Sequence, residues 1–190
     1  MGGGGPCYVY HVANAFETAD GTIALDVALY EYAWRPDGKR AGARLRRWRI
    51  PPGAGKAEEV PLDDQKIEFP RIDDRNTGRP HTIIYALANN RDLESGSFGG
   101  LLRYDLKSGE TQYHDFGESR TPSEFALAPA LGGGDDEGWL IGFVYDRARD
   151  ASDLMIFDAQ RVRAEPVARI QLPRRVPQGF HGAWIPEEMV

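Results

Sequence analysis

The sequence predicts an all-β fold, and three of its features support that prediction. Apolar residues at helical spacing are nearly absent, whereas short segments rich in β-branched and aromatic residues recur along the chain. The 22 glycines and 13 prolines punctuate these segments, as is typical of many short strands joined by tight turns. With 41% hydrophobic and 11% aromatic residues, the 190-residue chain can bury a core.

Ten strands are expected, each of them short or alternating in polarity and bounded by Gly, Pro or Asp. In chain order they are Tyr8–His11, Thr22–Tyr30, Arg44–Ile50, Glu58–Leu62, Thr82–Leu87, Leu101–Leu106, Thr111–Phe116, Gly138–Tyr145, Leu154–Asp158 and Pro166–Leu172. Between the sixth and the seventh, the turn Lys107-Ser108-Gly109 predicts a β-hairpin.

A weak repeat underlies these strands. Trp48, Tyr104 and Phe157 each occupy the second position of a short strand segment, and they lie 56 and 53 residues apart. Such a period is typical of β-propeller blades of about four strands, and at about 54 residues a blade the chain holds roughly three and a half of them. Because an incomplete ring leaves strand edges and blade faces uncovered, the chain is expected to continue into a longer protein or to pair with another chain. On the spacing alone, three unrelated hairpins in a sandwich remain an equal alternative.

Composition excludes several classes of function. The net charge of −6 and the absence of a basic stripe disfavour nucleic-acid binding. No run of about 18 apolar residues predicts a transmembrane segment. Residues 1–5 are expected to be a flexible Gly-rich start without the features of a signal peptide. Since Cys7 is the only cysteine, no intramolecular disulfide can form, and a cytoplasmic location is expected.

Two of the four histidines stand apart by their context. His11 ends an aromatic strand that begins at Tyr8, and His181 lies between Gly179 and Gly182, which would let backbone or a ligand approach its ring. For a lone histidine, an ordinary hydrogen-bonded position in the core or on the surface is the more common outcome.

Two glutamates are placed in a similar way. Glu68 lies between apolar neighbours, and Glu124 comes just before an apolar strand. A carboxylate in such a position needs a partner, because burying an unpaired charge is costly. One such partner is a metal-bound histidine, whose second ring nitrogen donates to the carboxylate. Pairing with arginine is the alternative, since the chain has 23 Lys and Arg residues.

Taken in order, the motifs of the chain resemble those of the carotenoid cleavage oxygenases. The resemblance extends from about Pro6 to Pro186, and its individual motifs are weak whereas their ordered succession is specific. The motifs that carry it most clearly are His11-x-x-Asn14-Ala15-Phe16-Glu17, Glu68-Phe69-Pro70-Arg71-Ile72, Pro122-Ser123-Glu124 and Pro177-x-Gly179-Phe180-His181-Gly182.

The resemblance implies a seven-bladed β-propeller with Fe(II) on its axis, bound by four histidines. His11 matches the third of these ligands and His181 the fourth, while Glu68 and Glu124 match the glutamates that orient them. No catalytic residue beyond this metal site is implied. Family members use the iron and O2 to cleave a carbon–carbon double bond of a hydrophobic conjugated alkene such as a carotenoid, an apocarotenoid or a stilbene.

The departures from the family pattern are informative as well. The first two histidine ligands have no counterpart, because His81 and His114 fall at no ligand motif and His114 is expected on an outward-looking strand. Phe125 replaces a smaller residue and is expected to narrow the site. Residues 1–190 are therefore expected to be the C-terminal part of a single propeller domain, with three to four of its seven blades and without the N-terminal half that a complete iron site needs.

Two other functions stay open at this point. The chain could be a catalytically inactive remnant or a non-catalytic propeller module, because two imidazoles alone give an incomplete iron site. Less well supported is an unrelated sugar- or peptide-binding propeller in which His11 and His181 are ordinary core residues.

Overall fold

The computed structural model describes residues 7–32, 42–89, 98–177 and 179–187, and these form an all-β structure, as predicted. The expected flexible start at residues 1–5 lies outside the described residues. In chain order the elements are β1 (Tyr8–Glu17), β2 (Ile23–Tyr30), β3 (Ala43–Ile50), β4 (Glu58–Arg71), the 3₁₀ turn η1 (Asp74–Asn76), β5 (Ile83–Ala88), β6 (Gly100–Asp105), β7 (Thr111–Asp115), β8 (Arg120–Pro129), β9 (Gly138–Asp146), β10 (Ala151–Asp158) and β11 (Ala168–Gln171). None of the helical structure in these four ranges has the length and apolar character needed to cross a membrane.

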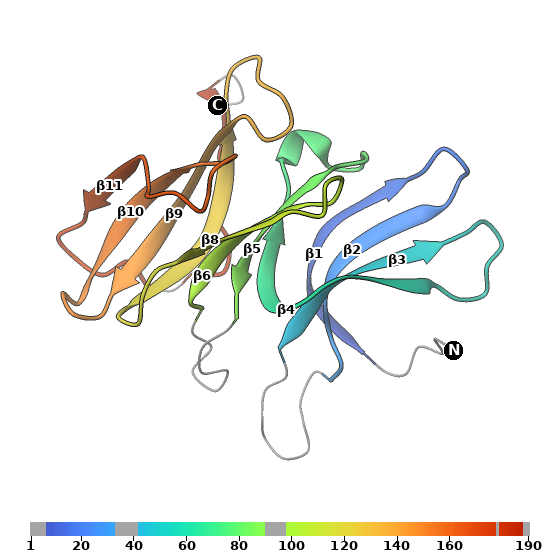
Figure 1. Ribbon diagram of the computed structural model, residues 1–190, viewed down its shortest axis with the longest axis horizontal. Helices are drawn as coiled ribbons and strands as arrows, with labels where there is room; N and C mark the ends of the chain where they lie inside the picture. The colour runs from blue at the N-terminus through green and yellow to red at the C-terminus, as the bar shows by residue number, and fades with distance from the viewer. Residues whose placement is uncertain (1–6, 33–41, 90–97, 178, 188–190) are drawn as a thin grey trace.

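The strands form three blade-like groups of antiparallel strands that fan out across the molecule (Figure 1). β1 to β7 follow one another in a seven-stranded sheet, and β8 to β11 form a separate four-stranded sheet. β4 belongs to two groups, because it pairs with β3 along Glu58–Ile67 and with β5 along Ile67–Arg71. The seven-stranded sheet is therefore two four-stranded blades that share β4, and the third blade is β8–β11.

The aromatic repeat coincides with these blades. Trp48 lies on β3, Tyr104 on β6 and Phe157 on β10, so each occupies the third strand of its own group. Tyr104 and Phe157 are buried and Trp48 is half-buried. The blade spacing is thus confirmed, and the alternative of unrelated hairpins is wrong.

The core fills the spaces between neighbouring blades. All six residues of β5 are buried, and their side chains alternate between two separate apolar clusters. Ile83, Tyr85 and Leu87 join the cluster shared with β8, β9 and β10. Ile84 and Ala86 join the cluster shared with β2 and β3. Because β5 is buried on both faces, it lies between the strands of the first blade and those of the last blade.

The strand predictions differ from the structure mainly at β4 and β8. β4 was expected to end at Leu62, but it continues to Arg71, because pairing with β3 resumes beyond an irregularity at the polar run that begins with Asp63. The ten expected ranges omit β8, which begins at Arg120, before the apolar stretch that the sequence indicates. β1 also extends six residues further than expected, to Glu17.

A buried charge cluster stabilises the first blade. Asp26 on β2 has no exposed surface, and its carboxylate accepts hydrogen bonds of 2.6 and 2.7 Å from Arg47 on β3. The Nε2 atom of His81 lies 2.9 Å from the same carboxylate, and the Nδ1 atom of His81 lies 3.0 Å from the amide of Asn14 on β1. Burial alone would raise the pKa of Asp26, but the hydrogen bonds from Arg47, together with the close approach of His81, outweigh it and leave the pKa lowered.

Replacing Asp26 by alanine should therefore lower the free energy of unfolding by about 3–5 kcal/mol at neutral pH, because it leaves Arg47 and His81 without their buried partner. Since the pKa of Asp26 is lowered on folding, its contribution is fully present above the ordinary value of 3.8 and is lost as the pH falls through the lowered value. Urea unfolding at neutral and acidic pH measures both effects. Asp64→Ala, at an exposed partner of Arg46, should change stability by about 1 kcal/mol or less, and an equal loss in both variants would contradict the assignment.

Candidate functional site

His11 and Glu68 form the first half of the site. They come from β1 and β4, and the Nδ1 atom of His11 lies 2.5 Å from the Oε2 atom of Glu68. Glu68 is only 4% exposed, and its Oε1 atom accepts a hydrogen bond of 2.7 Å from the Tyr30 hydroxyl. Its Oε2 atom also accepts the backbone N–H of Phe69. Both oxygens of this buried carboxylate are therefore satisfied.

Phe69 follows Glu68 in a backbone conformation that aromatic residues seldom adopt. Its φ of 51° lies in the left-handed region, and the pairing of β4 with β5 is irregular between Glu68 and Arg71. The Phe69 ring lies beside both histidines, with centroid distances of 4.7 Å to His11 and 6.0 Å to His181. Strain of this kind clusters at functional sites, so Phe69 marks this part of the molecule as one.

His181 and Glu124 form the second half of the site. Glu124 comes from β8, whereas His181 lies in the C-terminal segment 179–187, which contains no strand. The Oε1 atom of Glu124 lies 3.4 Å from the Nδ1 atom of His181, and its Oε2 atom accepts the Gly182 N–H at 2.8 Å. An Nη1 atom of Arg71 lies 3.2 Å from Oε2. The arginine partnership expected as an alternative is thus present together with the histidine contact.

The two halves meet at the imidazole rings. The ring centroids of His11 and His181 lie 5.0 Å apart and the rings are nearly perpendicular, at 74°. Imidazole nitrogens bind transition metals at about 2.0–2.1 Å, so two rings that share one ion must have their centroids within roughly 6–7 Å of each other. Because each Nδ1 atom faces a carboxylate, the Nε2 atom of each ring is left for a metal.

A polar pocket of about 240 Å³ adjoins the two imidazoles. It is lined by His11, Val12, Ala13, Pro70, Arg71, Ile72, Asp74, Thr77, Glu124 and His181. The electrostatics of this pocket favour a cation. The hydrogen bond that His11 donates to Glu68, aided by the charges of Glu68 and Glu124 and opposed by burial, raises the pKa of His11 above its ordinary value of 6.5. The described residues contain no group of three or more His, Cys, Asp and Glu side chains arranged to bind a metal.

The spacing of the four site residues repeats the blade period. Positions 11, 68, 124 and 181 are separated by 57, 56 and 57 residues. The first three lie on β1, on the second half of β4 and on β8, each of which is the first strand of its blade. One structural position therefore recurs on the first strands of the three blades, occupied in turn by His, Glu and Glu, and His181 follows after a further 57 residues in the strandless C-terminal segment. This spacing is readable in the sequence, and it would have linked the four residues without any family resemblance.

The remaining histidines and Phe125 lie elsewhere. His81 belongs to the buried cluster around Asp26. His114 does not look outward as expected, because its ring packs against Phe116 and the buried Phe157, and burial lowers its pKa. The expectation that Phe125 narrows the site is also wrong: it lies in the core between the blades, packed against Phe116 and Phe157.

Comparisons with known proteins identify the family of the chain. Residues 3–186 match the family model described as retinal pigment epithelial membrane protein, RPE65. The chain is 32% identical to a carotenoid cleavage oxygenase of Mycobacterium tuberculosis over 95% of its length, and 30% identical to the carotenoid 9,10(9',10')-cleavage dioxygenase 1 of Pisum sativum over 97%. It is 29% identical to the apocarotenoid-15,15'-oxygenase of Synechocystis over 93%. In each case it spans 38% of the relative's length.

The fold matches a solved structure of the same group. The crystal structure of cobalt-substituted Synechocystis apocarotenoid oxygenase superimposes with a TM-score of 0.85 at 28% identity. The match covers 94% of this chain and 39% of the other. The partial propeller expected from the blade arithmetic is thereby confirmed, and the cobalt substitution points to a metal cofactor in this group of proteins.

Replacing Tyr30 by phenylalanine should lower the free energy of unfolding by about 1.5–3 kcal/mol, because it removes a hydrogen bond to the buried carboxylate of Glu68. Urea unfolding of the chain measures this loss. Tyr10→Phe is the control, since Tyr10 is exposed and its ring packs against Tyr30. Equal stability of the two variants would show that the Tyr30 hydroxyl does not support Glu68.

Proposed function

Because the chain belongs to the carotenoid cleavage oxygenase family, we propose that it forms part of a non-haem Fe(II) dioxygenase that cleaves a carbon–carbon double bond of a carotenoid, an apocarotenoid or a stilbene. The observation that supports this most directly is the approach of His11 and His181, whose ring centroids lie 5.0 Å apart with each Nδ1 atom facing a buried carboxylate. The family assignment rules out an unrelated sugar- or peptide-binding propeller.

In this proposal, His11 and His181 are two of four histidine ligands and bind through their Nε2 atoms. Imidazole is a ligand that suits iron. Glu68 and Glu124 each accept a hydrogen bond from the Nδ1–H group of their histidine, which fixes the tautomer and the ring orientation. Bound iron would supply the activation of O2 for alkene cleavage. The two remaining ligands would come from a part of the protein that this chain does not contain.

One aromatic side chain contacts both imidazoles of the site. The ring of Phe69 packs against His11 and, on another side, against Phe98 at a centroid distance of 5.5 Å. Both phenylalanines also pack against the core cluster of β5, β8, β9 and β10. The proposed partners, a hydrophobic conjugated alkene and O2, follow from the family assignment.

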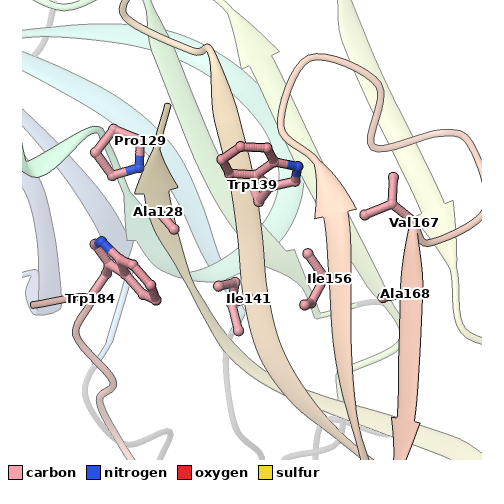
Figure 2. A pocket seen from close by; sticks show the side chains of 8 residues that line it. All are labelled: Ala128, Pro129, Trp139, Ile141, Ile156, Val167, Ala168 and Trp184. Atoms are coloured by element: carbon pink, nitrogen blue, oxygen red, sulfur yellow. The ribbon is translucent and has the colours of Figure 1, made fainter. Parts of the chain in front are cut away.

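The outer face of the last blade supports the proposal that residues 1–190 are the C-terminal part of a single propeller domain. Side chains that point away from the core form an apolar groove of about 350 Å³ across this blade (Figure 2). The groove is lined by Ala128, Pro129, Trp139, Ile141, Ile156, Val167, Ala168 and Trp184. Trp139 is 45% exposed and its neighbour Phe143 is 40% exposed. A continuous apolar face of this kind is typical of a surface that packs against another element.

The first blade offers a second face of the same kind. Ile23 on β2 pairs with Ile50 on β3, and both are more than a third exposed. Leu25 and Trp48 pair next to them and are half-buried. In a closed ring, further blades would cover both faces. A cytoplasmic location is part of the same proposal, supported by the single free cysteine, Cys7.

In the full-length protein that carries this chain, His11→Ala and His181→Ala should each abolish iron binding. Glu68→Gln and Glu124→Gln should weaken iron affinity or activity by about 10–100-fold, because the amide no longer holds the imidazole in the required tautomer. Metal analysis and alkene-cleavage assays measure these effects. Glu118→Gln, at an exposed glutamate, is the control. Normal iron content in both glutamate variants would contradict the role assigned to Glu68 and Glu124.

The isolated 190-residue chain should bind iron weakly and cleave nothing, because two imidazoles give an incomplete ligand set. Metal analysis of the purified chain and a cleavage assay test this. Near-stoichiometric iron together with activity would show that the missing ligands are dispensable or replaced. If the full-length protein is also inactive although its histidines are intact, the alternative of an inactive remnant or a non-catalytic module is correct.

A further inference from the structure

We propose that Arg71 is a positioning residue of the candidate metal site, which holds the segment carrying His181 against Glu124. This inference rests on the proposed function, since it assigns Arg71 to the same site. Arg71 lies at the end of β4, three residues after Glu68, and its side chain is 20% exposed.

His181 needs such a support because its segment has no strand pairing of its own. The side chain of His181 is 58% exposed, whereas that of His11, which lies on β1, is 20% exposed. The 3.4 Å contact between His181 and Glu124 is longer than an ordinary hydrogen bond. The position of the ring therefore depends on the neighbouring backbone at Gly182.

Both backbone polar groups of Gly182 are hydrogen-bonded to side chains. Its N–H donates to the Oε2 atom of Glu124 at 2.8 Å, and its carbonyl accepts from the Nη1 atom of Arg71 at 3.0 Å. The same Nη1 atom lies 3.2 Å from Glu124 Oε2. Arg71, Glu124 and the backbone of Gly182 thus each contact the other two, at the residue next to His181.

Arginine is suited to this role because its guanidinium presents several donors in a fixed plane. While Nη1 faces Gly182 and Glu124, Nη2 binds both carboxylate oxygens of Asp74 at 3.0 and 3.2 Å. Asp74 lies in η1. The side-chain amide of Asn14 on β1 donates to the carbonyl of Asn76 at the end of η1 and to that of Arg79 just after it. The guanidinium therefore connects the C-terminal segment to a well-anchored part of the first two blades.

Charge gives a second reason for an arginine at this position. Glu68 and Glu124 occupy equivalent places in neighbouring blades, so two buried carboxylates follow one another around the site. Glu68 is satisfied by His11, by the Tyr30 hydroxyl and by a backbone N–H. Glu124 lacks a hydroxyl partner of that kind among the described residues, and Arg71 compensates its charge instead.

The segment has another attachment further along the chain. Trp184 lies beside Ala128 and Pro129 at one end of the groove on the last blade (Figure 2). This apolar contact holds the segment near β8 but places no restraint on the peptide next to His181. The contacts of Arg71 are therefore expected to set the position of the ring itself.

The experiment is hydrogen exchange of the full chain, with the peptide that covers residues 179–187 compared with the peptide that covers β5. Arg71→Met should raise the exchange rate of the C-terminal peptide by about tenfold or more, because hydrogen bonds to a charged group are lost. Arg71→Lys, which keeps the charge but not the planar set of donors, should show a smaller increase. β5 should be unchanged in both variants.

Arg75→Met is the matched control, at an arginine in η1 four residues further along the chain. Arg75 binds Asp73 and the carbonyls of Gly133 and Gly134, and contacts neither Glu124 nor Gly182. It should leave the C-terminal peptide unchanged. Unchanged exchange in Arg71→Met, or the same increase in the control, would overturn the proposal. If Arg71→Met also raises the exchange rate of β5, the Arg71→Lys variant is used instead. A higher exchange rate at residues 179–187 alone in Arg71→Lys supports the proposal, and an unchanged rate there overturns it.

A Co²⁺ titration of the full-length protein separates this inference from the proposed function. Arg71→Met should weaken Co²⁺ affinity by about tenfold or more, and Arg75→Met should not. If the unmodified protein binds no Co²⁺ while exchange still responds to Arg71→Met, the proposed function fails and the anchoring role stands. If the protein binds Co²⁺ and Arg71→Met changes neither affinity nor exchange, the inference about Arg71 fails and the proposed function stands.

Discussion

Burying a carboxylate between packed β-sheets is tolerated only when its charge is matched, and Glu68 and Glu124 impose this requirement on the whole arrangement. The partners of Glu68 come from three strands, since His11 lies on β1, Tyr30 on β2 and the bonded N–H on β4 itself. The partners of Glu124 come from β4 and from the C-terminal segment. Matching two charges therefore fixes how neighbouring blades and the end of the chain lie relative to one another.

The recurrence of one position from blade to blade explains why this site can exist at all. Stacked blades place equivalent residues of their first strands next to one another, and a blade period of 56 or 57 residues brings positions 11, 68, 124 and 181 together. With a histidine at each end of this series, each imidazole has a carboxylate in the adjacent blade. The stacking of the first strands thus brings His11, Glu68 and Glu124 together, and the strandless segment 179–187 adds His181.

The sequence predicted the fold class and the blade period because these depend on local patterns, namely alternation, turn residues and the aromatic repeat. It indicated an apolar strand after Glu124 but not the start of β8 at Arg120, because Pro122 and Glu124 interrupt the alternation there. The left-handed conformation of Phe69 depends on how β4 pairs with β5, which no local pattern records. Arg71 could not be singled out among 23 Lys and Arg residues, since its partners lie on β8 and in the C-terminal segment.

The two imidazoles differ in how firmly the protein holds them. His11 is fixed by a strand and by a short contact with a carboxylate that has neutral donors as its other partners. His181 lies on a segment attached by a few hydrogen bonds and one apolar contact, and such segments open at lower free energy than core strands. A cation bound by both rings would stabilise the closed form of that segment, because a ligand that binds only the folded arrangement shifts the equilibrium toward it. Under the proposed function, His11 would therefore be the more firmly held ligand of the two and His181 the less firmly held one.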